Sequence, residues 1–221
     1  MEQQTERALD VRLDGRTEAS RAPGCHPPQE CPSTKNLLPV RHNSQNRSFT
    51  CGNTTGLMIA RYDGPKRSRY NHARLREKTM GGRAHMRTYV HHVTPWASKN
   101  FKRGLNRWMK GRSRGYYQQH KSPSPRRVRK AMRYSIDHGH PFAASTLELA
   151  TRDHYNGHPE GADIGHWLVV RGYDKNLRKI NSLDPAADSD ALPAYSEANK
   201  RFERRTKRFT RKFLQSHGIA A

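Results

Sequence analysis

The sequence of 221 residues predicts one α+β domain behind an N-terminal tail, and three features carry this prediction. Two short apolar runs, Trp167 to Val170 and Ile180 to Leu183, flank turn-forming residues in the manner of an antiparallel hairpin. A buried helical pattern begins near Cys51. The length is enough for one sizeable core and too short to favour two full domains, and the low hydrophobic share of 33% indicates that much of the chain is solvated tail or charged surface.

Residues 1–44 differ in composition from the rest of the chain. They mix Arg, Glu, Gln, Ser and Pro, with few apolar residues and no sustained period. Such a segment cannot bury enough apolar surface to fold alone. We therefore expect a disordered or loosely docked tail over 1–44, in which only Leu37 to Val40 could dock, and a domain over 45–221.

The charge of the chain is strongly one-sided. Its 42 Lys and Arg against 19 Asp and Glu give a formal net charge of +23. This balance indicates an anionic partner such as nucleic acid, a cell-wall polymer or a membrane surface, and it does not identify a fold. The sequence contains neither an apolar run of membrane-spanning length nor the apolar core of a secretion signal. As written, the protein is expected to be soluble and to begin in the cytoplasm, with export by another route left open.

The cysteines and histidines give no metal-ligand pattern. The cysteines are Cys25, Cys31 and Cys51, an odd number without a CxxC motif, so neither a disulfide framework nor a zinc ribbon is expected. Three histidine pairs lack a carboxylate or cysteine at ligand spacing: His91 with His92, His138 with His140, and His154 with His158. We interpret them as surface or turn residues, and we expect no metal and no cofactor.

The helix near Cys51 is the first element with a chemical implication. Gly52, Thr54, Thr55 and Gly56 precede a run of apolar residues, so the cysteine stands at the N-terminal turn. The positive end of the helix dipole favours thiolate over thiol and would make Cys51 a nucleophile. The alternative is an ordinary buried cysteine. Gln45 lies six positions earlier, where a loop could fold its amide back as an oxyanion donor.

Further elements follow toward the C-terminus. Helical spacing marks Tyr70 to Met80 and Asn100 to Lys110, with Trp108 as a core residue. A helix from Pro125 to Asp137 is expected to stop at Gly139.

After Gly139 the pattern changes from helix to strand. Ala143 to Leu147 reads as a buried strand, and Thr151 to Ile164 has the composition of a flap. A basic helix is expected over Tyr195 to Leu214, with Phe202, Phe209 and Phe213 packed on the sheet and Gly218 after its end.

The hairpin carries the second chemical feature. His166 stands at the start of its first strand and Asp184 at the end of its second. Because these ends are neighbours in an antiparallel pair, we expect the imidazole and the carboxylate to lie within reach of each other.

These residues occur in the motifs Q-x5-C-G-x-T, G-H-W-x-V-V-x-G-Y-D and D-P-A. From about Ser44 onward the chain resembles the papain-like cysteine peptidases of the C39 type. The resemblance implies a papain-like fold, in which the helix that begins with the catalytic cysteine packs on an antiparallel sheet. It also implies Cys51 as nucleophile, His166 as general base and acid, Asp184 as the group that orients His166, and Gln45 with the Cys51 backbone N–H as oxyanion donors.

A function follows from this resemblance, together with two alternatives. We expect hydrolysis of a peptide or isopeptide bond of a peptide or protein substrate through a thioester. Loss of a donor such as Gln45 costs on the order of 3 kcal/mol, so it should slow the reaction without abolishing it. The same triad could instead transfer the acyl group to an amine, as in transglutaminase-like enzymes. The chain could also be a basic nucleic-acid-binding protein on an inactive peptidase-like scaffold.

Overall fold

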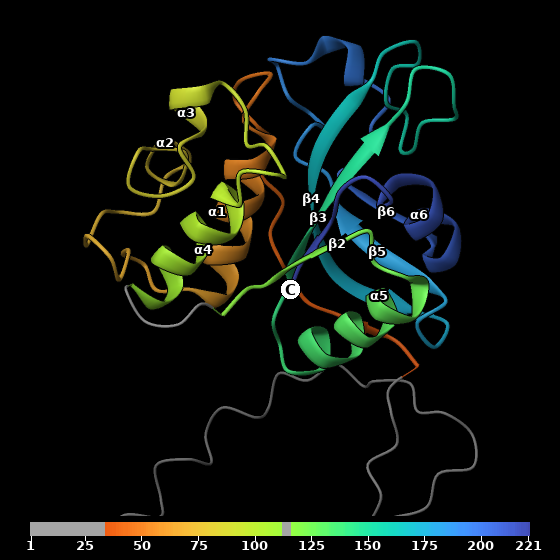
Figure 1. Ribbon diagram of the computed structural model, residues 1–221, viewed down its shortest axis with the longest axis horizontal. Coiled ribbons are helices and arrows are strands. Elements are labelled where there is room, and N and C mark those ends of the chain that lie inside the picture. The colour runs from red at the N-terminus through yellow and green to blue at the C-terminus, as the bar shows by residue number, and fades with distance from the viewer. Residues whose placement is uncertain (1–33, 112–115) are drawn as a thin grey trace, which may run out of the picture.

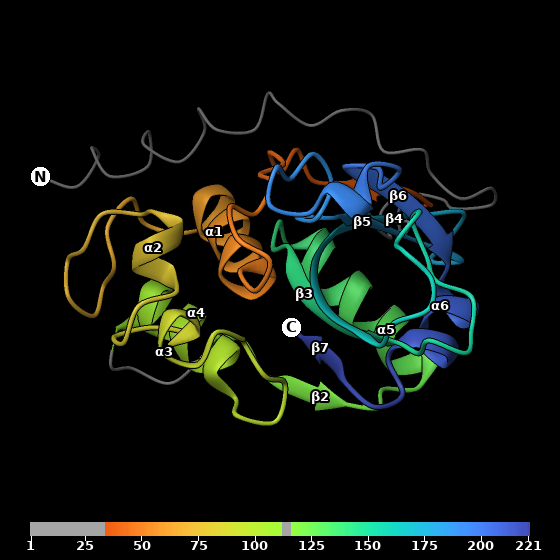
Figure 2. The same ribbon diagram turned by 90° about the horizontal axis from the view of Figure 1, so that it is seen from above.

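The helices of the N-terminal half stand beside a single sheet. The computed structural model describes residues 34–111 and 116–221. In Figure 1, four helices gather on one side of the sheet: α1 (Cys51–Asp63), α2 (Glu77–Met80), α3 (Thr88–His91) and α4 (Asn100–Lys110). Viewed from above in Figure 2, α1 lies between the other three helices and the sheet, and α6 (Thr206–Phe213) lies on the far side.

The sheet is antiparallel throughout its described pairs, in the order β2-β7-β3-β4-β5-β6, with β1 paired to β4. Its strands are β1 (Asn36–Leu37), β2 (Gln119–Lys121), β3 (Phe142–Glu148), β4 (Ile164–Asp174), β5 (Lys179–Leu183), β6 (Arg201–Arg205) and β7 (Gly218–Ala220). The predicted α+β class is confirmed. The predicted hairpin is β4–β5, and the strand expected at Ala143 to Leu147 is β3.

Helix α1 packs closely against the rest of the molecule because its first two turns carry glycines. A Cβ on Gly52 would lie 2.5 Å from the Thr94 side chain, and one on Gly56 would lie 2.3 Å from Met86 Cε. Thr55 Oγ1 donates to the carbonyl of Trp167 at 3.0 Å, which joins the helix directly to β4. The glycines therefore let α1 approach Thr94 and Met86, and Thr55 links the helix to the histidine strand.

The helix expected over Pro125 to Asp137 is present as α5 (Pro125–Ala131), which continues into a π-helical turn, η1 (Met132–Ile136). The Ser124 side chain caps its start by accepting from the N–H of Arg127 at 3.2 Å. Gly139 adopts a φ of 81° after its end, in agreement with the predicted stop. The helix Asn100 to Lys110 is α4, and Trp108 is fully buried in the core.

The helix predicted over Tyr70 to Met80 is wrong in extent. Only Glu77–Met80 is helical within Tyr70 to Met80, because the N–H of Ser68 donates to the carbonyl of Ala73 in a turn through His72, whose φ is 58°.

The basic C-terminal segment also differs from its prediction. It contains a 3-10 turn, η2 (Pro193–Tyr195), then strand β6 and helix α6, and Gly218 lies in β7. Phe202 and Phe209 are seven positions apart and match a helical period, but pairing of β6 with β5 satisfies the backbone around Phe202 instead. Both rings still pack in the core, as predicted.

The packed part of the chain begins before residue 45. Asn36 and Leu37 pair with Tyr173 and Gly172 of β4. Leu38 and Val40 are buried in the core. Cys25 and Cys31 lie outside the described residues. No helix among residues 34–111 and 116–221 is long and apolar enough to cross a membrane.

Candidate active site

Cys51 is the first residue of α1 and follows the N-cap residue Thr50. Its side chain is partly exposed and forms no disulfide. The N–H groups in the first turn of a helix have no partner within the helix, and the helix dipole adds a positive potential at this end. The sulfur therefore stands where an anion is stabilised.

His166 and Asp184 meet across the open end of the β4–β5 hairpin. The register pairs Val169 with Leu183, so His166 and Asp184 are at the same end of the two strands. His166 Nε2 donates to Asp184 Oδ1 at 2.8 Å. Both side chains are nearly inaccessible, with 5% and 0% exposed. The expected contact between these two residues is present.

The residue after His166 secures its strand to the helical side. Trp167 Nε1 donates to the carbonyl of Thr94 at 2.7 Å, and the Trp167 ring stacks on Phe101 of α4 with centroids 4.0 Å apart. Together with the bond from Thr55, these contacts fix the distance between β4 and α1. His166 and Asp184 thus meet at the hairpin, and Cys51 begins the helix that these contacts hold against β4.

The protonation of His166 is set by both neighbours. Burial alone would lower its pKa, but the Asp184 carboxylate and a hydrogen bond with Cys51 outweigh burial and raise the pKa to about 10. Because Nε2 is occupied by Asp184, Nδ1 is the ring nitrogen left for the thiol. Burial would raise the pKa of Asp184, yet His166 and His158 hold it well below its usual range. An imidazolium between a carboxylate and a sulfur is the favoured state.

The residues that surround Asp184 on its other side were not predicted from the sequence. His158, expected at the surface, is buried with a fully inaccessible side chain. Its Nε2 donates to Asp184 Oδ2 at 2.7 Å, and its Nδ1 donates to Glu148 Oε2 at 2.6 Å. Of the predicted surface or turn position, the surface part is wrong, and His158 closes a turn in which its N–H donates to the carbonyl of Tyr155. One signal was available, because Glu148 ends a strand whose other residues are mostly apolar or small.

The loop Thr151 to Ile164, expected to be a flap, is anchored by buried side chains. Asn156 adopts a φ of 58° and directs Nδ2 to Asp184 Oδ2 at 2.8 Å and to the carbonyl of Asn199 at 2.9 Å. Tyr155 donates from its N–H to Glu148 Oε1 at 2.7 Å. This loop therefore holds the carboxylates of both Asp184 and Glu148 in place.

Gln45 is buried near the same centre but is engaged with its own loop. Its Nε2 donates to the carbonyls of Arg47 at 2.8 Å and Ser48 at 3.2 Å. Its backbone N–H donates to the carbonyl of Pro185, next to Asp184, at 2.8 Å. The loop is thus joined to the Asp184 segment, while both amide hydrogens point at loop carbonyls.

The cluster also has to be considered as a metal site. One donor atom each from His158, His166 and Asp184 lies within 4.8 Å of the others. Each imidazole, however, faces its own oxygen of the Asp184 carboxylate at 2.7 or 2.8 Å. These separations are those of hydrogen bonds, and the two oxygens diverge toward different rings rather than converging on one point.

A cavity elsewhere in the molecule is separate from this cluster. Its volume is about 570 Å³, and none of the predicted site residues lines it. It is lined by Tyr116, Tyr117, Gln118, His120, Arg127, Lys130, Ala131, Tyr134, Ser135, His138, His140 and Ala221.

Known proteins resemble this chain over most of the described residues. The family model described as "Peptidase_C39 like family" matches residues 37–212. Among solved structures, the chain is similar to the crystal structure of xylellain, a cysteine protease from Xylella fastidiosa, at 11% identity and a TM-score of 0.42, over 85% of each chain. No curated protein sequence matches the chain.

Proposed function

Since the chain belongs to the Peptidase_C39 like family, we propose that it is a cysteine peptidase in which Cys51, His166 and Asp184 form the catalytic triad. The observation that carries this proposal is the chain of contacts from the helix N-terminus to the hairpin. Cys51 acts on the pKa of His166, which in turn donates to Asp184 at 2.8 Å. These are the nucleophile, the acid and base, and the orienting carboxylate that thiol hydrolysis requires.

In the proposed reaction, the Cys51 thiolate attacks the carbonyl carbon of a peptide or isopeptide bond. The His166 imidazolium gives its Nδ1 proton to the departing amine nitrogen, and the C–N bond breaks to leave a thioester. Water then attacks the thioester, His166 takes a proton from it, and the acid product leaves as the thiolate is regenerated. Asp184 accepts from Nε2 throughout and so keeps Nδ1 directed at the reacting atoms.

The negative oxygen formed in each step needs hydrogen-bond donors. The backbone N–H of Cys51 lies in the first turn of α1 and is one proposed donor. The Gln45 amide is the second. To serve in this way, it must exchange one of its bonds to the carbonyls of Arg47 and Ser48 for a bond to the oxyanion.

The reactivity of Cys51 tests this proposal without knowledge of the substrate. We expect iodoacetamide and the epoxide inhibitor E-64 to label Cys51 at pH 7 at least about 10-fold faster than Cys25 and Cys31, which serve as internal controls. Mass spectrometry of each cysteine-containing peptide measures the rates. His166→Ala should remove the difference, because the imidazolium that stabilises the thiolate is lost. Equal rates at all three cysteines, unchanged by His166→Ala, would refute the catalytic assignment.

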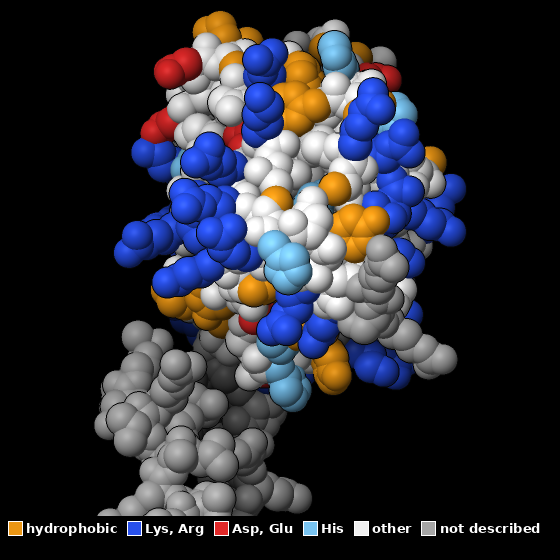
Figure 3. Space-filling view, turned by 90° about the vertical axis from the view of Figure 1, so that its left-hand side faces the viewer, with side chains coloured by type: hydrophobic (Ala, Val, Ile, Leu, Met, Phe, Trp, Pro, Cys, Tyr) orange, Lys and Arg blue, Asp and Glu red, His pale blue; other side chains and the backbone are white. Residues whose placement is uncertain are grey.

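Product analysis then separates the proposed reaction from its alternatives. Incubation with a mixture of peptides should yield free carboxyl products that disappear in Cys51→Ala. Added amine converts these products to amides if the enzyme is an acyl transferase. The face in Figure 3 carries many Lys and Arg and few Asp or Glu, and it supports nucleic-acid binding as a second candidate. That candidate requires salt-sensitive binding of DNA or RNA that survives Cys51→Ala.

A further inference from the structure

His158 stands between two buried carboxylates that come from different parts of the fold. Its Nδ1 lies 2.6 Å from Glu148 Oε2 at the end of β3, and its Nε2 lies 2.7 Å from Asp184 Oδ2 after β5. The side chains of all three residues are fully inaccessible. A buried ion is expensive unless it is paired and hydrogen bonded, so this arrangement constrains the charges that it can hold.

Counting protons gives the charge of His158. A neutral imidazole has one N–H, but here each ring nitrogen faces a carboxylate oxygen that can only accept when ionised. An imidazolium satisfies both contacts, with one positive charge between two negative ones. Burial alone would lower the pKa of His158, and the hydrogen bonds to Asp184 and Glu148 outweigh burial and raise it.

Other titratable groups around His158 do not replace this charge. The His166 ring lies edge-on with its centroid 5.2 Å away, and the Tyr155 and Tyr195 rings lie at 4.6 and 4.9 Å. Burial raises the pKa values of both tyrosines, so they are neutral at ordinary pH. His42 donates to the backbone carbonyl of Asp184 at 2.7 Å rather than to its carboxylate.

The Asp184 carboxylate is thereby held from both sides. Oδ1 accepts from His166 and from the N–H of Ala186 at 2.9 Å. Oδ2 accepts from His158 and from Asn156. With donors on both oxygens, the plane of the carboxylate cannot rotate away from His166 without breaking the bond to His158.

We propose that His158, fixed by Glu148, is a positioning residue that locks the Asp184 carboxylate on His166 and supplies a buried positive charge that sets the pH range of the Cys51–His166 pair. This inference rests on the proposed function for its catalytic meaning. Its effect on the protonation of Cys51 can be measured without any substrate.

The sign of the effect follows from electrostatics. A positive charge at His158 favours the thiolate of Cys51 and disfavours the second positive charge on His166. Removing it should raise the pKa of His166 and weaken the stabilisation of the Cys51 thiolate. For unit charges about 5 Å apart in a protein interior, with solvent screening taken into account, we expect shifts of about 1 pH unit.

The variant His158→Gln removes the charge but keeps an amide that can donate to Asp184. We expect the acid limb of Cys51 alkylation by iodoacetamide, followed on the Cys51 peptide, to move up by about 1 pH unit. Both limbs of kcat/KM for a cleaved peptide should move in the same direction. The matched control is His154→Gln in the same loop, because His154 Nε2 contacts the carbonyl of Leu149 and not the carboxylates. The pH profiles of this control should match those of the wild type.

A second variant guards against misfolding, because His158→Gln leaves the Glu148 carboxylate buried without a cation. Glu148→Gln/His158→Gln removes both charges and should melt at a higher temperature than the single variant. The limbs of its pH profiles should still shift upward but by less than in the single variant. The reason is that the Glu148 carboxylate lies farther from His166 than His158 does, so its loss offsets only part of the shift. In the wild-type protein, ¹⁵N NMR of histidine should show both nitrogens of His158 protonated from pH 6 to 8.

The outcomes separate the two proposals. Lower rates or lower melting temperatures with unmoved limbs in both variants would make His158 purely structural and overturn the inference. A neutral His158 ring in the NMR spectra would overturn it as well. If the alkylation limb shifts but no peptide is cleaved, the inference stands and the proposed hydrolysis fails.

Discussion

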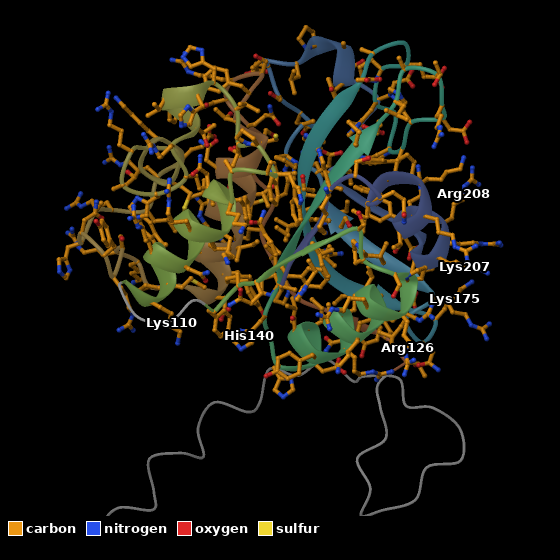
Figure 4. All side chains as sticks on the ribbon, viewed as in Figure 1. Lys110, Arg126, His140, Lys175, Lys207 and Arg208 are labelled. Carbon is orange, nitrogen blue, oxygen red and sulfur yellow. The ribbon has the colours of Figure 1, made fainter. Side chains whose placement is uncertain are left out.

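Two histidine–carboxylate pairs in this molecule have nearly the same contact distance and different surroundings. His166 and Asp184 are 2.8 Å apart with 5% and 0% of their side chains exposed. His140 and Asp63 are 2.7 Å apart with 35% and 18% exposed. Figure 4 shows His140 at the edge of the molecule near Lys110, and its partner Asp63 is the last residue of α1, the helix that begins with Cys51.

The two carboxylates respond in opposite directions. Burial raises the pKa of Asp63, and its hydrogen bond with His140 does not compensate. Asp184 is more deeply buried, yet its pKa is held well below the usual range by His166 and His158. The difference is the number of donors, since Asp184 also accepts from Asn156 and the N–H of Ala186. A surrounding network, rather than the distance within the pair, decides which carboxylate is reliably charged.

The largest expected effect comes from replacing Asp184, the carboxylate with the more extensive hydrogen-bond network. Asp184→Asn should lower kcat/KM for peptide cleavage by about 10²-fold or more, because His166 loses its orienting acceptor and the positive charge that it carries. Alkylation of Cys51 by iodoacetamide at pH 7 should slow with it. Near-normal rates for a folded Asp184→Asn protein would show that the buried pair does not matter more than the exposed one.

The pH dependence of stability should differ between the pairs in a second, intermediate effect. The raised pKa of His166, to about 10, contributes stability that is complete below about pH 6.5 and is lost as the pH rises through the folded value. The depressed pKa of Asp184 contributes stability that is lost below about pH 4.

Thermal unfolding from pH 3 to 10 measures this profile. The wild-type melting temperature should fall at both ends by about 4 °C or more, and Asp184→Asn should flatten both limbs. A variant profile parallel to that of the wild type would contradict the assignment of these limbs to the buried pair.

The smallest effect is expected from the exposed pair. Because burial raises the pKa of Asp63, its ionised form costs stability in the folded state, and Asp63→Asn relieves that cost. The melting temperature should change by no more than about 2 °C, and the rate of Cys51 alkylation should stay within about 2-fold. A large loss of either would mean that the Asp63 contact matters as much as that of Asp184.

The same contrast explains which parts of the site could be predicted from the sequence. His154 and His158 are four positions apart in one loop and looked equivalent, yet only the second is enclosed by carboxylates. Its partners, Glu148 and Asp184, lie 10 and 26 residues away along the chain. No local pattern links such positions, because the contact exists only once β3 and the β4–β5 hairpin have paired.

Local periodicity was likewise decisive in some elements and misleading in others. The hairpin and the helix at Cys51 have signals that depend on neighbouring residues alone, and both predictions are confirmed. The segment Arg201–Arg205 matched a helical period through Phe202 but forms the edge strand β6. There the backbone bonds to β5, a tertiary partner, outweigh helix propensity. The predicted basic helix forms only as α6, where its side chains Lys207 and Arg208 point away from the molecule in Figure 4.

The sequence by itself determined the α+β class and the positions of Cys51, His166 and Asp184 at the ends of their elements, because turn residues and apolar periods act over a few positions. It also determined the family, through the motifs around these residues. The tertiary structure alone decided that the Gln45 amide faces loop carbonyls and that His158 and Glu148 complete a buried row of charges. Burial and pairing between distant segments set those features, since a charge is stabilised inside a protein only by partners that folding brings to it.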